Sequence, residues 1–239
     1  MSERAIPIDG RSYQVDGRAV ARRAIPDSGL EHDYDATELV LSDDDVIDPW
    51  PDEQADNDVA ATGSPLYKLD GINDNPAAVY DGVDDYHVGD HMPPGDNSVY
   101  TLAVVVNPDS TSDYQIIFGN DIDDGGSRRG TRVEIEDGDY RLLHGGVAGV
   151  ATTAASTTPD ILVASYDGST AVLDVNDKEA GSDSVSYSSG SEEAAPIGAR
   201  SDGRDTFGGA VGRVLWYSEH YDSDGRSEIH DGLASQFGL

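Results

Sequence analysis

The sequence predicts an all-β protein: a sandwich of two antiparallel sheets, preceded by an N-terminal arm and closed by one short C-terminal helix. Three observations support this fold class. The apolar runs are short, and Gly, Asp and Asn separate them, which favours tight turns. Some runs alternate apolar with charged residues, as strands with one buried face do. Helical spacing of apolar residues is clear only near the end of the chain.

The strands follow from these runs in chain order. The longest run ends at Asn107-Pro108, and Val133 and Ile135 alternate with charged residues. Asp137-Gly138 and the segment 167–170 are turn sequences between such runs, which predicts two hairpins. We expect strands at 39–41, 100–106, 115–118, 132–136, 140–143, 161–166, 171–175 and 211–217. We expect a core containing Leu102, Val104, Ile117, Val133, Val163, Leu173 and Trp216.

The predicted helix lies after the last strand. Ser223 or Asp224 is a suitable N-cap. Ile229, Leu233 and Phe237 follow at intervals of four residues, which places them on one face. We therefore expect this face to pack on the sandwich.

Charge separates the N-terminal region from the rest. Residues 1–30 hold five arginines and four acids, whereas residues 31–60 hold twelve acids and neither Lys nor Arg. We divide the chain into an arm, residues 1–34, and a sandwich domain, residues 35–239. The arm is predicted to dock onto a sister copy or another protein through Arg11, Arg18, Arg22 and Arg23, since guanidinium groups pair well with carboxylates. The alternative is a disordered terminus.

The composition limits the partners. Asp and Glu number 47 against 15 Lys and Arg, a formal net charge of −32. Nucleic acid is excluded, because phosphate binding requires a basic patch. The same acidity, with 12 Tyr and clear apolar runs, indicates a folded protein adapted to molar salt, where self-repulsion is screened.

Other sequence features bear on environment. Without Cys, the chain forms no disulfide and no thiolate metal site. No apolar run is long enough to span a bilayer, so we expect no membrane insertion. Residues 1–4 lack an apolar signal region, so we expect no export by an N-terminal signal.

Several segments, in order, resemble a known family. Residues 76–86 read Pro-Ala-Ala-Val-Tyr-Asp-Gly-Val-Asp-Asp-Tyr, and the ending from Phe207 reads Phe-Gly-Gly-Ala-Val-Gly-Arg-Val-Leu-Trp-Tyr. Further pieces are Trp50-Pro51-Asp52, Asn57, 100–107, Tyr166-Asp167-Gly168, Val175-Asn176, 196–199 and 233–238. Together they resemble the LamG-like, concanavalin A-like lectin and glucanase domains, which implies a jelly-roll sandwich. The chain departs from the family pattern at Tyr80, where the family has Phe, and at Asp177, where it has Gly.

The resemblance also implies where catalytic carboxylates would lie. Related glycoside hydrolases carry a row of three acids on one strand. Glu134 and Glu136 share a strand face here, but the third acid is absent and Asp137 begins a turn. Strand glutamates in so acidic a chain are typical of a solvated face. We therefore expect a protein that binds and does not catalyse.

Candidate binding residues are few. Arg128 and Arg129 are the only paired basic residues of the domain and suit an acidic sugar or an acidic neighbour; the alternative is a surface loop without a role. With His144 and Tyr86 they form our ligand-binding candidates. Asp121, Asp123 and Asp124 offer oxygen ligands for calcium on a Gly-containing loop, and calcium is the one cofactor that the sequence suggests.

The functional hypothesis joins these points. A glycan-binding sandwich without an export signal, but with a docking arm, fits a virion surface component of a haloarchaeal virus, such as a turret, spike or fibre, that recognises host glycans. Such a protein is expected to be a homo-oligomer bound to other virion proteins. The alternative is a carbohydrate-binding or adhesion module, in the cytoplasm or on the surface of a halophilic archaeon. A laminarinase-type hydrolase is the third possibility.

Overall fold

The computed structural model describes part of the chain. Backbone is described for residues 12–15, 18–21, 24–89, 98–119, 122–124, 127–144, 147–185, 195–200 and 202–239. Side chains are described for 24–89, 98–119, 130–144, 153–185, 196–200 and 202–239.

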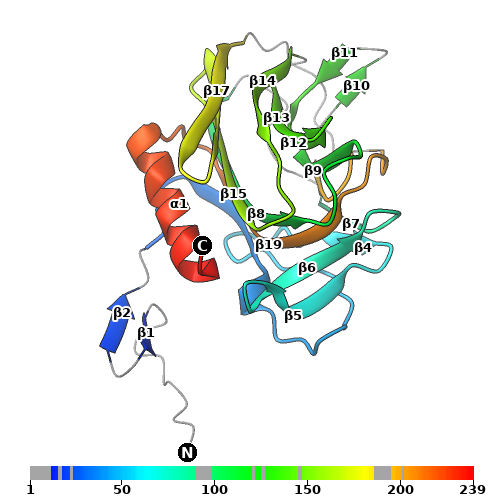
Figure 1. Cartoon of the computed structure of the whole chain (residues 1–239), viewed down its shortest axis with the longest axis vertical. Helices are drawn as coiled ribbons and strands as arrows, with labels where there is room; N and C mark the ends of the chain where they lie inside the picture. Colours follow the sequence, from blue (N-terminus) through cyan, green and yellow to red (C-terminus); the bar gives the residue numbers. More distant parts are fainter. Residues whose placement is uncertain are drawn as a thin grey trace, which may run out of the picture.

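Two large antiparallel sheets form a sandwich (Figure 1), which confirms the predicted all-β class. The seven-stranded sheet has the order β14 (Val147–Ala154), β13 (Asp139–His144), β12 (Thr131–Glu136), β9 (Gln115–Gly119), β18 (Ala195–Ile197), β7 (Tyr86–Gly89), β4 (Ala60–Thr62). The eight-stranded sheet has the order β17 (Lys178–Ser184), β16 (Thr170–Val175), β15 (Asp160–Tyr166), β8 (Tyr100–Pro108), β19 (Gly208–Tyr217), β6 (Asn75–Asp81), β5 (Leu66–Ile72), and β3 (Leu30–Asp35) also pairs with β19. Two small hairpins are β1 (Ser12–Val15) with β2 (Arg18–Ala21), and β10 (Ile122–Asp124) with β11 (Ser127–Arg129).

The main core lies between the two large sheets, because alternate residues of facing strands point inward. All seven side chains predicted for the core are buried, with at most 2% of their surface exposed. Six of them belong to this main core, and Val163 lies on the outer face of the eight-stranded sheet. An aromatic group at one end of the core contains Tyr100 stacked on Trp216, with 4.9 Å between ring centroids. The sequence thus predicts the buried faces of the central strands correctly.

Tight turns join neighbouring strands where the sequence expects them. Asp137 and Gly138, between β12 and β13, both have positive φ angles, as a two-residue hairpin turn requires. Asn176 and Asp177, between β16 and β17, also have positive φ angles. Asp177 therefore forms the turn despite replacing the Gly of the related family.

A second core lies outside the sandwich. Helix α1 (Ser223–Phe237) packs on the outer face of the eight-stranded sheet (Figure 1), and Ile229, Leu233 and Phe237 are fully buried, as predicted. The N-cap differs from the prediction: the Asp222 side chain accepts a hydrogen bond from the Gly225 amide, so neither Ser223 nor Asp224 caps the helix. Asp222 lies just outside the first turn, and this is the position that its carboxylate needs to reach the free amides.

The last residues of the predicted arm belong to the sheet. β3 pairs with β19, and the buried Asp33 carboxylate accepts hydrogen bonds from Arg213. Burial raises the pKa of Asp33, although the Arg213 guanidinium acts to lower it. Ile25 packs against the second core beside Gly232. Residues 24–34 of the predicted arm therefore contact their own sandwich.

One predicted strand is wrong. Residues 39–41 form no strand, and Val40 is 99% exposed. Asp35 caps a short 3₁₀ helix (Ala36–Glu38), and the chain then runs along the edge strand β5, where the Asp44 amide donates to the Tyr67 carbonyl. Within the run Leu39 is half-buried against the main core, whereas Val40 and Leu41 are exposed.

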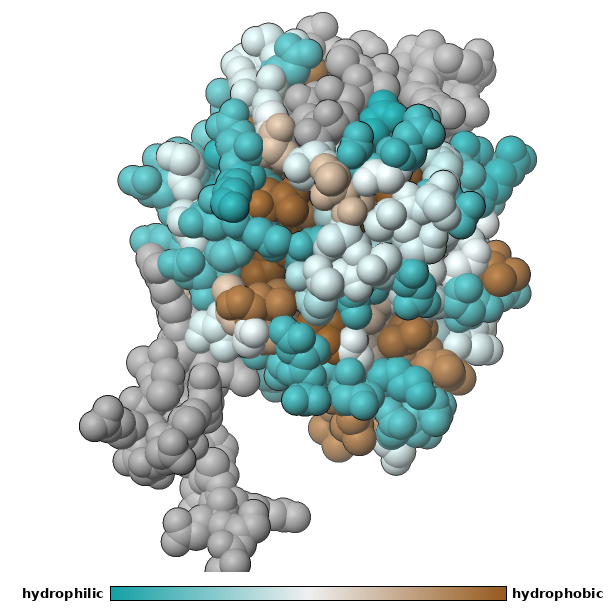
Figure 2. All heavy atoms as spheres, viewed as in Figure 1, coloured by the Kyte–Doolittle hydropathy of each residue, from teal (hydrophilic) through white to brown (hydrophobic). Residues whose placement is uncertain are grey.

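The surface is mostly polar. Figure 2 shows one face of the molecule, on which hydrophilic residues predominate and apolar ones form small separate groups. Within the described residues, the helices are all too short or too polar to cross a membrane.

Candidate functional site

The described residues form a hollow of about 340 Å³ at one end of the sandwich. We call it the acidic hollow. It lies where the end of β6, the connection between β8 and β9, and the start of β19 meet. Its lining consists of Asp81, Gly82, Asp109, Ser110, Asp113, Tyr114, Gln115, Asp205, Thr206 and Gly208.

Two glycines allow the backbones to approach closely there. Gly208 pairs with Asp81 across β19 and β6. Gly82 has a φ of +74°, and a Cβ atom at this position would lie 3.2 Å from the Gly208 Cα. Only glycine combines this dihedral with this spacing at low cost. The chain therefore turns at Gly82, directly after β6.

Hydrogen bonds fix the lining loops. The Gln115 side chain accepts from the Gly208 amide at 2.9 Å and donates to the Ser110 carbonyl at 2.8 Å. The Thr206 hydroxyl donates to the Gly82 carbonyl at 2.8 Å. Two of these bonds, Gly208 to Gln115 and Thr206 to Gly82, join different lining segments, and the bond from Gln115 to Ser110 holds the β8–β9 connection. The hollow is therefore largely formed before any ligand binds.

The lining is rich in acceptors. Four of its ten residues are aspartates, namely Asp81, Asp109, Asp113 and Asp205, and none is Lys, Arg or His. The Asp81 carboxylate also accepts from the Val83 amide at 2.7 Å, which fixes its orientation. Arg200 lies 3.3 Å from Asp205 and offsets part of this charge from outside the lining. Such a lining suits a ligand that donates hydrogen bonds.

Tyr114 connects the hollow with a buried ionic group. Its hydroxyl donates to Glu134 at 3.0 Å, and the Arg132 guanidinium lies 5.7 Å from its ring centroid. Arg132 and Glu134 form a buried ion pair, and Arg141 contacts both Glu134 and Glu136. The expected solvated glutamate face is thus wrong for Glu134, which is 1% exposed because these groups surround it.

The predicted binding residues do not form one site. His144 is 1% exposed and lies in the core, where the Thr131 hydroxyl is 2.9 Å from its Nδ1. Burial lowers the pKa of His144 to about 4. Tyr86 is half-buried on β7, and three strands, β18, β9 and β12, separate it from the strand of His144.

The remaining predicted residues are described by backbone alone or not at all. Arg128 and Arg129 lie on β11, and Asp123, paired in register with Arg128, lies with Asp124 on β10. Arg18 lies on β2. Asp121, Arg11, Arg22 and Arg23 lie outside the described residues. The calcium, sugar and docking roles of this set stay predictions.

Sequence reasoning did not find the acidic hollow. Asp109, Asp113 and Asp205 lie among many other surface acids, and no local pattern separates them. The glycines at 82 and 208 are the available local signal, since they allow the backbones to approach closely, but they do not indicate which acids surround them.

Comparisons with known proteins place the fold. No protein-family model and no curated protein sequence matches the chain. Among solved structures, the sialidase of Trypanosoma rangeli with sialic acid has a TM-score of 0.65 and 15% identity over 96% of this chain and 36% of that one. Domain 4 of AbnA, a GH43 extracellular arabinanase of Geobacillus stearothermophilus, in complex with arabinotriose, has a TM-score of 0.62 and 14% identity over 86% of this chain and 100% of that one.

A third similar structure is the receptor binding domain of a botulinum neurotoxin C/D mosaic serotype, with a TM-score of 0.64 and 10% identity over 85% of this chain and 51% of that one. The chain spans about a third of the length of the sialidases that it matches. At these identities the likeness shows the fold, a β-sandwich shared with carbohydrate-binding and sialidase structures.

These comparisons correct one expectation. The sequence indicated a protein that does not catalyse. Sialidases, which are enzymes, are prominent among the similar structures. Because the fold occurs in enzymes, absence of catalysis does not follow for this chain, and that expectation is withdrawn.

Proposed function

We propose that the chain binds glycans, and that the acidic hollow takes a neutral, hydroxyl-rich sugar. The observation that carries this proposal is the lining itself, with four carboxylates, two hydroxyl side chains and one tyrosine. Sugar hydroxyl groups donate well to carboxylates, and an aromatic ring offers a flat apolar surface for a sugar ring. The volume of about 340 Å³ is within the range of small-ligand pockets.

Charge favours a neutral sugar over an acidic one. A sialic acid carries a carboxylate, which would lie close to Asp81, Asp109, Asp113 and Asp205 with no cationic side chain in the lining. Of the sugars bound in the similar structures, arabinotriose is neutral and sialic acid is not. The lining therefore favours a ligand that, like arabinotriose, carries no charge.

Calorimetry with oligosaccharides tests the proposal. The protein, in about 2 M salt to screen its net charge, is titrated with arabinotriose and other neutral oligosaccharides and, separately, with sialylated ones. We expect a neutral oligosaccharide to bind, and Asp113→Asn or Asp205→Asn to weaken it roughly 10-fold or more, the loss of one hydrogen bond to a charged group.

Asp183→Asn is the matched control, because Asp183 is exposed on β17, at the far edge of the same sheet from β6. Equal affinity for the hollow variants and this control would exclude the hollow as the site. Tighter binding of the sialylated sugars would overturn the charge argument.

We further propose, from sequence alone, that the setting is the virion surface of a haloarchaeal virus, with a cell-surface adhesion module of a halophilic archaeon as the alternative. The net charge of −32 and the arginine-rich start of the chain support it. In the viral case the ligand is a host glycan, and the residues before Ala24 attach the sandwich to a sister copy or to other virion proteins. Mass spectrometry of purified virus particles, which would have to contain the protein, separates the two settings.

A further inference from the structure

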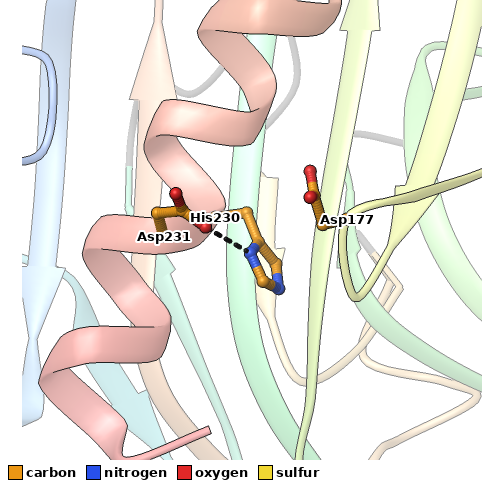
Figure 3. Close-up of side chains that lie close together, drawn as sticks. All are labelled: Asp177, His230 and Asp231. Carbon is orange, nitrogen blue, oxygen red and sulfur yellow. Dashed lines mark hydrogen bonds and ion pairs between the residues drawn. The ribbon is translucent and has the colours of Figure 1, made fainter.

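A second group of chemically active side chains lies away from the acidic hollow. His230 and Asp231 lie on α1, and Asp177 lies in the turn between β16 and β17. One ligand atom from each of the three lies within 4.8 Å of the others. Figure 3 shows the His230 ring extending from the helix toward the turn that carries Asp177, with Asp231 beside it. His230 Nδ1 is 3.5 Å from an Asp231 carboxylate oxygen.

Packing holds both sides of this group. Ile229, the residue before His230, is fully buried in the second core, which fixes the height of the helix above the sheet. On the other side, the Asn176 side chain donates to Asp160 at 2.6 Å and accepts from the Ile161 amide at 2.9 Å. Asp177 follows Asn176 directly, so its backbone is held at a fixed place beside α1.

The donor set selects the kind of ligand. One imidazole nitrogen and two carboxylate oxygens are donors that Zn²⁺ and similar first-row ions accept. Calcium and magnesium prefer oxygen alone. Two carboxylates and a neutral imidazole sum to −2, which matches the charge of a divalent cation.

The spacing is compatible with such an ion. Bonds of about 2.0–2.2 Å in tetrahedral geometry place ligand atoms roughly 3.3 Å apart. The present separations, up to 4.8 Å, require a contraction of roughly 1.5 Å at most. Asp177 is exposed, so rotation of its side chain supplies this movement without disturbing the core.

We propose that His230, Asp231 and Asp177 bind one zinc-class divalent ion, with water as the remaining ligand, and that this ion joins α1 to the β16–β17 turn. Because the site needs both elements in place, the ion binds the folded chain more tightly than the unfolded one. It therefore stabilises the fold as its concentration rises.

The test uses the full chain after chelator treatment, in about 2 M sodium nitrate, where screening limits loose binding to surface acids. Zn²⁺ is titrated by calorimetry, and the melting temperature is measured with Zn²⁺, with Ca²⁺ and without either. We expect one equivalent of Zn²⁺ to bind and the melting temperature to rise, and Ca²⁺ at the same concentration to leave it unchanged.

His230→Ala and Asp177→Asn are each expected to remove the stoichiometric binding and the rise in melting temperature. His220→Ala is the matched control, since His220 is exposed and outside this group, and it keeps both. Circular dichroism confirms that each variant is folded. For a second readout, Co²⁺ in place of Zn²⁺ gives a visible absorption band that the two variants lose. Binding of Zn²⁺ by folded His230→Ala with unchanged stoichiometry and affinity, or an equal effect of Ca²⁺, overturns the proposal.

Discussion

Two buried histidines, His87 and His144, lie in the core, where each takes part in hydrogen bonds through its ring. His87 contacts the Tyr80 hydroxyl and the Ile47 carbonyl, both at 2.9 Å. Burial lowers the pKa of His87, like that of His144, to about 4, from an ordinary value of 6.5. Both are therefore neutral in the folded protein at neutral pH.

The folded protein is expected to lose stability as pH falls from 6.5 toward 4. In this window the unfolded chain binds protons at these histidines that the folded chain does not bind, which favours unfolding. Each histidine contributes up to about 1.4 kcal/mol per pH unit. Urea unfolding of His144→Phe and of the wild-type protein at several pH values should show a slope that is smaller in the variant by up to this amount.

Asp33 provides a check on this interpretation. Burial raises the pKa of its carboxyl group, so the folded chain holds this proton more tightly than the unfolded chain. Its contribution therefore has the opposite sign to that of the histidines, since it is lost as pH rises above 3.8. A slope between pH 6.5 and 5 that is identical in the wild-type protein and His144→Phe would show that His144 is not the group responsible.

Gly82 is expected to be sensitive to substitution. Gly82→Ala should lower the free energy of unfolding by roughly 2 kcal/mol, because alanine is strained at a φ of +74° and its Cβ meets the Gly208 Cα. Gly138 has a φ of +87°, but the nearest atom to a Cβ there is the Thr111 carbonyl oxygen, 4.0 Å away. Gly138→Ala therefore introduces backbone strain without a close contact and should cost roughly 1 kcal/mol. Equal losses, measured by urea unfolding, would mean that the close approach at Gly208 contributes nothing.

At the scale of elements, α1 is held by charge as well as by apolar contact. Arg226 donates to Asp174 on β16 at 2.6 Å, and both side chains are nearly buried. A buried pair of this kind stabilises little compared with apolar residues, but loss of one partner leaves the other charge without compensation.

Arg226→Met is therefore expected to lower the free energy of unfolding by roughly 3 kcal/mol. The double variant Arg226→Met with Asp174→Leu should recover most of this loss, since it leaves no buried charge. Urea unfolding of the wild-type, single and double variants gives the comparison. A double variant as unstable as the single one would contradict this account of the pair.

The positions of the strands along the sequence could be predicted, but not which strands lie side by side in the sheets. Residues 100–106 and 211–217 are recognisable as strands from local pattern, and β8 and β19 contain them. That β19 lies between β8 and β6, and pairs with β3 at its other end, depends on contacts between residues more than a hundred positions apart. The strand predicted at 39–41 is wrong for the same reason, because the tertiary structure places these residues outside the sheets.

The acidic hollow was unpredictable on similar grounds. Its residues come from three separated segments around Asp81, Asp109 and Asp205, which meet only through that strand order. A turn at Gly82 follows from the local sequence, whereas the hollow around it does not.

For the molecule as a whole, the net charge of −32 dominates the dependence on solvent. Melting temperature is expected to rise between about 0.1 M and 3 M KCl, as the Debye length falls from roughly 10 Å to under 3 Å and self-repulsion is screened. Replacing exposed acids such as Asp43 and Asp183 with Asn should raise the melting temperature at low salt more than at high salt. A melting temperature that is independent of KCl would refute the salt adaptation.

The two ends of the long strand β19 lie in two distant regions of the molecule. Gly208, at its start, lines the acidic hollow, whereas Tyr217, at its end, bonds to the Pro26 carbonyl, where the chain enters the sandwich. Ten extended residues span roughly 30 Å. A partner bound to the residues before Ala24 would therefore hold the sandwich at the end opposite the acidic hollow. The hollow would then face away from that partner and toward the surroundings.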